Sequence, residues 1–218
     1  KLRWKDIGFT SDGIVSGIGK GLLFSLVCSV LAYAIESFTL FFLHGNVHLS
    51  FYASGFSLTN EKGSQAGILF IILSVLFNLI NVWMEEGVFR GLFTKILEGI
   101  SYRKSLFFIA FLFGIWHLAM PLRDYLQGES SLLNLIVMGF GYVILAGMMS
   151  IKWSLLYKMT DSLWLGLGDH LFNNLASNLV HVVSNSEGDS LQIVRILLWQ
   201  LLSFAIVLII YTRKSKTI

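Results

Sequence analysis

The sequence predicts an all-α integral membrane protein with about six transmembrane helices that enclose a polar cavity. Hydrophobic residues make up 55% of the 218 residues and charged residues 13%, whereas charge is about 25% of a soluble domain. The mean hydropathy is +0.72. Long apolar runs alternate with short polar segments, and each run approaches the ~20 residues that cross a hydrocarbon core. We therefore expect one membrane domain over residues 1–218.

The expected elements follow the apolar runs in chain order. Residues 1–20, where Trp4 and Phe9 lie among basic residues, are predicted to form an interfacial segment. A cleaved signal is not expected there, because no short apolar core with a small-residue cleavage site follows. Pro121 is expected to end the third span. The six spans are predicted at 21–43, 66–88, 105–120, 132–151, 163–183 and 190–211.

Basic residues predict the orientation, because cytoplasmic loops hold the excess of Lys and Arg. With both termini in the cytoplasm, the outer loops hold only Lys62 and Arg123 of the 16 basic residues. No basic stretch is interleaved with aromatic residues, so nucleic acid is not an expected partner. The apolar spans make the lipid bilayer an expected partner. The segments assigned to the cytoplasm contain Lys1, Arg3, Lys5, Lys20, Lys95, Arg103, Lys104, Lys152, Lys158, Arg213, Lys214 and Lys216.

Polar residues line one face of the second span. At 100° per residue, Ser74, Asn78 and Asn81 lie within about 40° of Glu85. Ionisable residues inside apolar spans are expensive and indicate function. Glu85 with its polar neighbours is therefore the leading candidate for a functional group.

Glu86 and Arg90 lie away from that stripe, at about +100° and +140° from Glu85. Since they are neighbours at i and i+4, we expect them to neutralise each other. A purely structural ion pair and a functional role are equally open for these two residues at this point.

The depths of the polar groups can be counted along the helices at ~1.5 Å per residue. Glu85 lies sixteen residues before Ser101 and His117 sixteen residues after it, so an antiparallel pair of spans places them at one level. His170, counted from the turn near Asp161, lies at ~13 Å against ~24 Å for the first two. The count predicts that His170 joins them only if the second helix extends beyond the bilayer.

The fifth span carries a polar stripe of its own. His170, Asn174, Asn178 and His181 recur at i, i+4, i+8 and i+11. A lone histidine on a helix is more often a structural residue, but four polar residues on one face indicate a polar interior.

These residue types support two kinds of chemistry. Glu85, His117 and His170 form a ligand set for zinc that leaves a position for water. Alternatively, Glu85 and His117 activate water directly, and His170 and Asn174 donate hydrogen bonds to an oxyanion. Both describe peptide-bond hydrolysis, and the metal-bound and metal-free forms stay equally open. The single cysteine, Cys28, excludes a multi-cysteine metal site.

Three motifs occur in the order of one known family: E-E-x-x-x-R from Glu85 to Arg90, F-x-x-x-H from Phe113 to His117, and H-x-x-x-N from His170 to Asn174. The chain resembles the CPBP family of intramembrane proteases, which includes the CAAX prenyl endopeptidases and the bacterial Abi proteins. The match covers residues 66–183, the expected catalytic core helices.

The resemblance implies a helical membrane fold with a catalytic centre inside the bilayer, reached from the cytoplasmic side. By position, Glu85 and His117 would activate water, and His170 and Asn174 would bind the oxyanion. On the metalloprotease view, His117 and His170 would help to hold zinc. The expected catalytic residues are Glu85, Glu86, His117, His170 and Asn174, and the expected supporting residues are Arg90, Asn81, Asn78 and Phe113.

Six spans resemble the bacterial branch of the family, which implies a bacterial cytoplasmic membrane and substrates that are not prenylated. The expected substrates are membrane-associated peptides or protein tails, such as signalling-peptide or bacteriocin precursors. Two other classes stay open: a non-proteolytic scaffold or bacteriocin-immunity protein that binds a partner in the same cavity, and a transporter whose buried charges form an ion path.

Other intramembrane proteases fit the sequence less well. Gly166 to Asp169 matches the G-x-G-D pattern of presenilin-like aspartyl proteases, but that chemistry needs a second intramembrane aspartate. The other aspartates fall in loops or near the N-terminus. The H-E-x-x-H and G-x-S-x-G motifs are absent.

Overall fold

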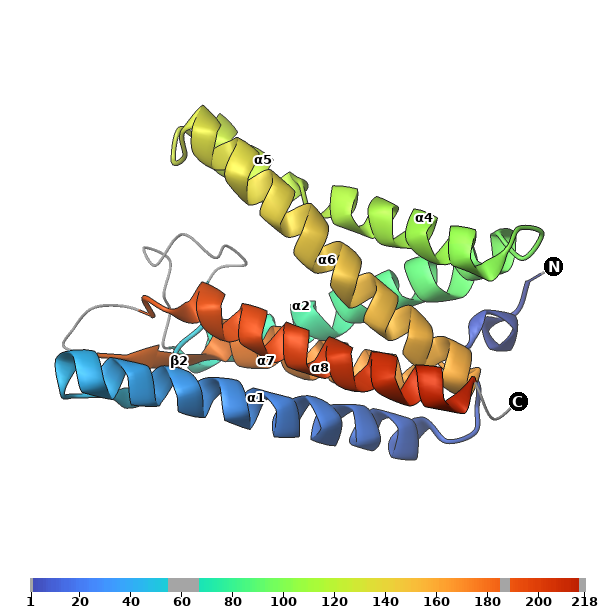
Figure 1. Cartoon of the computed structure of the whole chain (residues 1–218), viewed down its shortest axis with the longest axis horizontal. Coiled ribbons are helices and arrows are strands. Elements are labelled where there is room, and N and C mark those ends of the chain that lie inside the picture. Colours follow the sequence, from blue (N-terminus) through green and yellow to red (C-terminus); the bar gives the residue numbers. More distant parts are fainter. Residues whose placement is uncertain (1, 55–66, 185–188, 216–218) are drawn as a thin grey trace.

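The protein is a bundle of helices in a computed structural model that describes residues 2–54, 67–184 and 189–215 (Figure 1). Within these ranges, five helical stretches are long and apolar enough to cross a membrane: Ile14–His44, Ile68–Ile96, Tyr102–Leu126, Leu132–Thr160 and Gln192–Lys214. A further helix, α7 (Trp164–Leu179), is shorter and packs against α1 (Ile14–His44) and α2 (Ile68–Glu85). The prediction of a helical, polytopic membrane protein is confirmed.

Two of the long stretches are composite. After α2, the chain continues as a π-helical segment, η3 (Glu86–Leu92), and then as α3 (Phe93–Ile96). The third stretch comprises α4 (Tyr102–Trp116) and α5 (Ala119–Leu126), with a break at His117 and Leu118. The remaining elements are η1 (Trp4–Ile7), β1 (His48–Phe51), α6 (Leu132–Thr160), β2 (Val180–Val183) and α8 (Gln192–Lys214).

The N-terminal segment differs from the expected interfacial stretch. Helix α1 begins at Ile14, within the range 1–20. Phe9 is buried and stacks on Trp83, with ring centroids 4.6 Å apart, whereas Trp4 is exposed. The interfacial prediction is wrong for residues 14–20, because they form the first turns of the candidate span Ile14–His44.

The predicted fifth span is too long, because α7 ends at Leu179. Val180, Val182 and Val183 are β-branched and favour extended backbone, and β2 pairs antiparallel with β1. The all-α prediction therefore omits a short two-stranded antiparallel sheet at this end of the bundle. His181 leaves the face of the helix on which the i+11 spacing placed it.

Pro121 does not end the third span. Helix α4 has already ended at Trp116, and Pro121 lies in the first turn of α5. In that turn the missing proline N–H removes no helical hydrogen bond.

The helices form two packed groups. Helix α1 packs against α7 and α8, and α4 packs against α6, which crosses to contact α7 and α8. The first turn of α1 and the last turn of α8 lie at the same end of the bundle (Figure 1). Of the basic residues used for the orientation, Lys1, Lys62 and Lys216 lie outside the described residues.

Glycines allow α1 and α7 to pack at close range. A Cβ atom added at Gly21 would lie 2.7 Å from the Asp169 backbone nitrogen and would collide with the Leu165 carbonyl oxygen. On the opposite helix, a Cβ added at Gly168 would collide with the Ile18 carbonyl oxygen. Small residues permit such close backbone contact in membrane helices. This contact sets the position of α7, which carries His170.

We expect Gly21→Ala to lower the melting temperature of the detergent-solubilised protein, because the new methyl group must push α7 away from α1. Gly19→Ala is the matched control, since a Cβ at Gly19 meets nothing within 4 Å. Thermal unfolding of both variants checks the prediction. Equal melting temperatures would show that the α1–α7 contact adjusts without loss.

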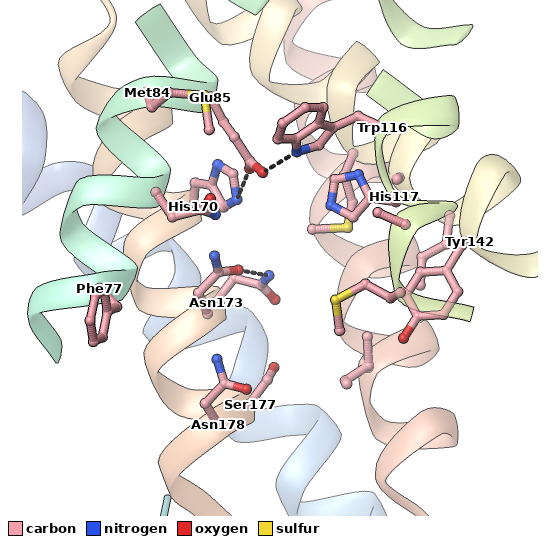
Figure 2. A pocket seen from close by; sticks show the side chains of 18 of the residues that line it. Phe77, Met84, Glu85, Trp116, His117, Tyr142, His170, Asn173, Ser177 and Asn178 are labelled. Carbon is pink, nitrogen blue, oxygen red and sulfur yellow. Dashed lines mark hydrogen bonds and ion pairs between the residues drawn. The ribbon is translucent and has the colours of Figure 1, made fainter. Parts of the chain in front are cut away.

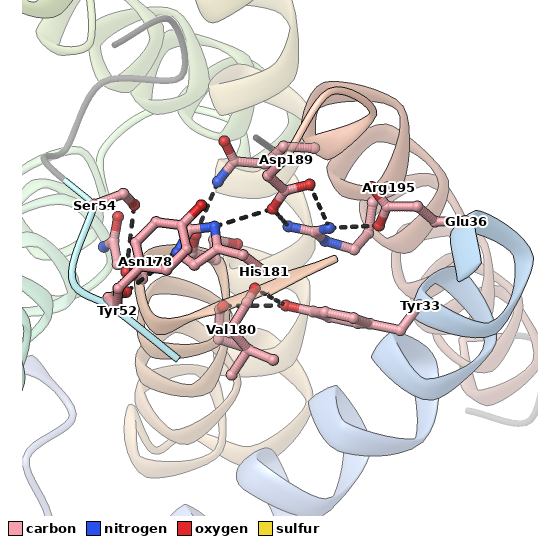
Figure 3. A network of polar contacts seen from close by, with 12 residues as sticks. Tyr33, Glu36, Tyr52, Ser54, Asn178, Val180, His181, Asp189 and Arg195 are labelled. Atoms are coloured by element: carbon pink, nitrogen blue, oxygen red, sulfur yellow. Dashed lines mark hydrogen bonds and ion pairs between the residues drawn. The ribbon is translucent and has the colours of Figure 1, made fainter. Parts of the chain in front are cut away.

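A buried ionic network joins α1, α8 and the two strands (Figure 3). Arg195 donates to Asp189 Oδ2 at 2.6 Å and also pairs with Glu36, which sequence reasoning left unassigned. His181 Nδ1 lies 3.0 Å from the same Asp189 oxygen, and its ring stacks on Tyr52. Burial favours a higher pKa for Asp189, but the hydrogen bonds from His181 and Arg195 outweigh it and hold that pKa below its ordinary value. The network stabilises the end of the bundle at which the strands lie.

Candidate active site

A cavity of about 670 Å³ lies between two walls of helices (Figure 2). Helices α2 and α7 form one wall, and α4, α5 and α6 form the other. Most of the lining is apolar, with Phe77 and Met84 among the contributing side chains. On α7, Asn173, Ser177 and Asn178 form a column of polar groups along the wall.

His170 is held between two carboxylates on the α2 side. Its Nδ1 atom lies 2.8 Å from Glu86 Oε1, and its Nε2 atom lies 3.5 Å from Glu85 Oε2. All three side chains are buried. Glu86 is therefore more than a partner for Arg90: it fixes the ring of His170 and turns Nε2 toward Glu85 and the cavity. The depth mismatch counted from the sequence disappears because the second helix continues through η3 and α3 to Ile96.

Glu85 projects into the cavity and is held by a residue of the opposite wall. Trp116 Nε1 donates a hydrogen bond of 3.0 Å to Glu85 Oε1. The other oxygen, Oε2, has no hydrogen-bond partner among the described residues. This carboxylate thus has one oxygen fixed and one able to accept a proton. The Trp116 contact was not predicted, and its only signal in the sequence is the position of Trp116 next to His117.

His117 faces the cavity from the wall opposite Glu85 (Figure 2). Its Nδ1 atom lies 2.8 Å from the Phe113 carbonyl oxygen, which only accepts hydrogen bonds. Nδ1 must therefore carry the proton, so that in the neutral ring Nε2 is a free acceptor. No hydrogen bond joins His117 to Glu85, and the cavity separates the two groups that the helix count placed at one level.

Arg90 is a fully buried cation behind His170. Its Nη1 atom is 3.6 Å from Glu86 Oε1, the pairing that the i,i+4 spacing predicts. The guanidinium carbon lies 4.0 Å from the ring centroid of Phe113 and 4.8 Å from that of Trp153. None of its three guanidinium nitrogens has a hydrogen bond within the described part of the chain. The cation is stabilised by the carboxylate and by two aromatic faces.

The predicted asparagines fall in different places. Asn81 and Asn174 line the cavity. Asn78 is fully buried: it donates to the Ser74 carbonyl oxygen at 2.7 Å and accepts from Asn178 at 3.4 Å. Asn78 thus joins α2 to α7 through Asn178, which lines the cavity.

A second buried ion pair lies behind His170, where sequence reasoning assigned no function. Lys152, which was counted as a cytoplasmic charge, is fully buried, and its Nζ atom is 2.7 Å from Asp169 Oδ2. Trp153 Nε1 also donates to that oxygen at 2.7 Å, and the Trp153 ring stacks on His170 with centroids 3.7 Å apart. The assignment of Lys152 to a cytoplasmic segment is wrong because its charge is neutralised inside the bundle. The available signal was the combination of Lys152 on one apolar helix with Asp169 on the next.

The three predicted zinc ligands are not grouped around one point. Within the described residues, no three His, Cys, Asp or Glu side chains are grouped closely enough to hold one. His117 faces Glu85 from across the cavity. Glu85, His117 and His170 would have to converge for zinc to bind.

The comparisons with known proteins bear on the same segment. No curated protein and no solved structure matches the chain at a significant level. The family described as Type II CAAX prenyl endopeptidase Rce1-like matches residues 67–176, about half of the chain. That range contains Glu85, His117 and His170, the groups that face the cavity. The chain therefore belongs to the Rce1-like family of type II CAAX prenyl endopeptidases.

Proposed function

We propose that this protein is an intramembrane endopeptidase that cleaves membrane-associated peptides or protein tails. The observation that carries the proposal is that Glu85 and His117 face one cavity from opposite walls, inside helices apolar enough to cross a membrane. Membership of a CAAX-type protease family supports the same reaction. In this proposal the bilayer and the peptide substrate are the partners.

The proposed nucleophile is a water molecule between Glu85 and His117. Glu85 Oε2, which accepts no hydrogen bond from the described residues, and the free acceptor at His117 Nε2 both suit proton abstraction. As the proton leaves, the water oxygen attacks the peptide carbonyl carbon, and the carbonyl oxygen becomes an oxyanion. The base then returns the proton to the leaving amine as the C–N bond breaks.

The proposed oxyanion donors are His170 and Asn174, both on the α7 wall. His170 Nδ1 is engaged by Glu86, so only Nε2 is directed toward the cavity. A ring that donates from both nitrogens is doubly protonated. The two flanking carboxylates stabilise that state and burial opposes it. Glu86 is accordingly assigned to orienting His170, and Glu85 to activating water.

The cavity favours peptides with apolar side chains next to the cleaved bond. Ile80 and Met84 from one wall and Met120, Leu145 and Met149 from the other provide an apolar lining. Methionine side chains adapt to differently shaped partners. We propose that residues adjoining the scissile bond enter this apolar part, while their backbone lies along the polar column of α7.

The experiment that tests this function is cleavage of a panel of membrane-associated peptides by the purified protein in detergent. We expect the wild-type protein to cleave and His117→Ala to lose most activity. Peptides that bind but remain intact would favour a scaffold or immunity protein. For the zinc alternative at Glu85, His117 and His170, a chelator decides: we expect undiminished cleavage, whereas loss restored by added zinc would establish a metal.

We further propose that the chain is one membrane domain of a bacterial cytoplasmic membrane, with both termini in the cytoplasm. Helix α1 begins and α8 ends at the same end of the bundle, which supports placing both termini on one side of the membrane (Figure 1). In intact cells, a membrane-impermeant maleimide is expected to label a cysteine placed at Glu129 and not one placed at Ser101, with Cys28 replaced by alanine. The opposite labelling would invert the topology.

A further inference from the structure

The buried Lys152 has a complete set of hydrogen-bond acceptors. Its ammonium group donates to Asp169 Oδ2 at 2.7 Å, to Gln200 Oε1 at 3.0 Å and to Ser203 Oγ at 3.1 Å. An ammonium group has three donors and no acceptor. All three of its protons are therefore used, inside a region where Lys152, Gln200 and Ser203 are fully buried.

The ammonium group dictates how the neighbouring amide is oriented. Since Lys152 only donates, the oxygen of Gln200 must face it and the nitrogen must point away. Gln200 Nε2 donates to Asn173 Oδ1 at 2.6 Å, and Asn173 Nδ2 donates to Asn174 Oδ1 at 3.2 Å. Each amide accepts on one side and donates on the other. The orientation set by the charge is thereby passed from α8 to α7.

The chain of amides ends at the cavity. Asn174 lines the cavity, and its oxygen is engaged by Asn173. Within the described residues, no acceptor is bound to the Asn174 Nδ2 group. The group left to donate into the cavity is therefore the NH₂ group. The oxygen and nitrogen ends of a carboxamide have nearly the same size, so packing alone does not select this orientation.

We propose that Lys152 is a positioning residue that acts through Gln200 and Asn173 to direct the NH₂ group of Asn174 into the cavity. The inference rests on the proposed function, in which that group stabilises the oxyanion. A reversed amide would present its oxygen to the oxyanion and repel it. The charge of Lys152 thus decides whether Asn174 helps or hinders the reaction.

The same ion pair also supports His170. Asp169 Oδ2, which binds Lys152, accepts a hydrogen bond from Trp153, and the Trp153 ring stacks on His170 at an interplanar angle of 16°. Hydrogen bonds in such a buried site do not compete with water and are correspondingly strong. Lys152 and Asp169 therefore connect to both proposed oxyanion donors.

Gln200→Glu tests the orientation, because an ionised carboxylate still accepts from Lys152 but cannot donate to Asn173. Asn173 must then turn its NH₂ group toward position 200, and Asn174 must reverse in response. We expect kcat to fall by about 10²-fold, the order of one lost oxyanion donor, with little change in KM. The loss should deepen as pH rises through the ionisation of the introduced carboxylate, because its protonated form still donates to Asn173.

Gln200→Met is the matched control. It removes the hydrogen bond to Asn173 without forcing the Asn173 and Asn174 amides to reverse, so we expect a smaller loss of kcat. A role in packing predicts the opposite order, because glutamate keeps both the shape and the Lys152 contact. In an Asn174→Ala background, Gln200→Glu should change kcat by less than about twofold, since the two substitutions act through one group. An equal loss in both backgrounds would overturn the proposal.

A measurement that does not need activity separates this inference from the proposed function. Side-chain amide signals of Asn173 and Asn174 are recorded by NMR on protein labelled with ¹⁵N-asparagine, with Asn174→Ala used for assignment. Gln200→Glu should shift both sets of signals. Unchanged Asn174 signals would overturn the proposal that Lys152 orients Asn174 through Gln200 and Asn173. Shifted signals in a protein that cleaves no peptide would leave the orientation by Lys152 standing and reject the protease.

Discussion

Glu85→Gln is expected to reduce kcat for peptide cleavage by about 10²- to 10⁴-fold, the range that a general base contributes. Glutamine has the shape of glutamate, and its oxygen still accepts the hydrogen bond from Trp116 Nε1. The cavity therefore keeps its geometry and loses only the group that takes the proton from water. Initial rates over a range of substrate concentrations separate kcat from KM, and KM is expected to change little.

Glu98→Gln is the control for this substitution. Glu98 follows α3, and its exposed side chain pairs with Lys95. The same change from carboxylate to amide outside the cavity is expected to leave kcat unaltered. Full activity of Glu85→Gln would remove Glu85 as the base, and a severe loss in Glu86→Gln alone would transfer that role to Glu86.

Arg90→Met is expected to destabilise the protein by roughly 3–5 kcal/mol, the cost of leaving one charge of a buried pair without its partner. Both members of the pair are buried, with Arg90 Nη1 3.6 Å from Glu86 Oε1. The substitution also removes the cation from the faces of Phe113 and Trp153. Unfolding in detergent by increasing denaturant measures the change in free energy.

The double variant Arg90→Met/Glu86→Gln is expected to be little less stable than Arg90→Met alone. The second substitution removes the stranded charge, while the glutamine oxygen still accepts from His170 Nδ1. Additive losses in this double-mutant cycle would show that the two residues stabilise the protein independently.

Lys95 and Glu98 provide a matched pair at the surface. Their side chains are 36% and 61% exposed and lie 2.7 Å apart. Because water screens such pairs, Lys95→Met is expected to cost no more than about 1 kcal/mol. A cost as large as that of Arg90→Met would contradict the assignment of the Arg90 effect to burial.

Local patterns in the sequence predicted the membrane class and most of the helices, because crossing a hydrocarbon core requires long apolar runs that any chain must display. The i,i+4 spacing was sufficient to pair Glu86 with Arg90. Counting residues at helical spacing failed for His181, because α7 ends at Leu179 and the backbone after it pairs with another strand. That strand is β1, distant in the sequence.

The role of each buried charge depended on partners that sequence spacing does not reveal. Lys152 followed the positive-inside pattern, yet it meets Asp169 and Gln200 from two other helices. Glu86 appeared to face away from the polar stripe, yet it binds His170 across the α2–α7 contact. That contact depends on the position of α7, which its close packing against α1 at Gly21 sets.

The sequence by itself determined that this protein lies in a membrane and is helical, and it identified the candidate catalytic groups. It could do so because hydropathy and motif spacing are properties of the chain. Only the tertiary structure decided which groups share a cavity and which way their polar atoms point. The physical reason is that charges and hydrogen bonds act over a few ångströms between helices. The orientation of Asn174 by Lys152, as proposed, is the clearest case, since four residues on three helices must meet before it exists.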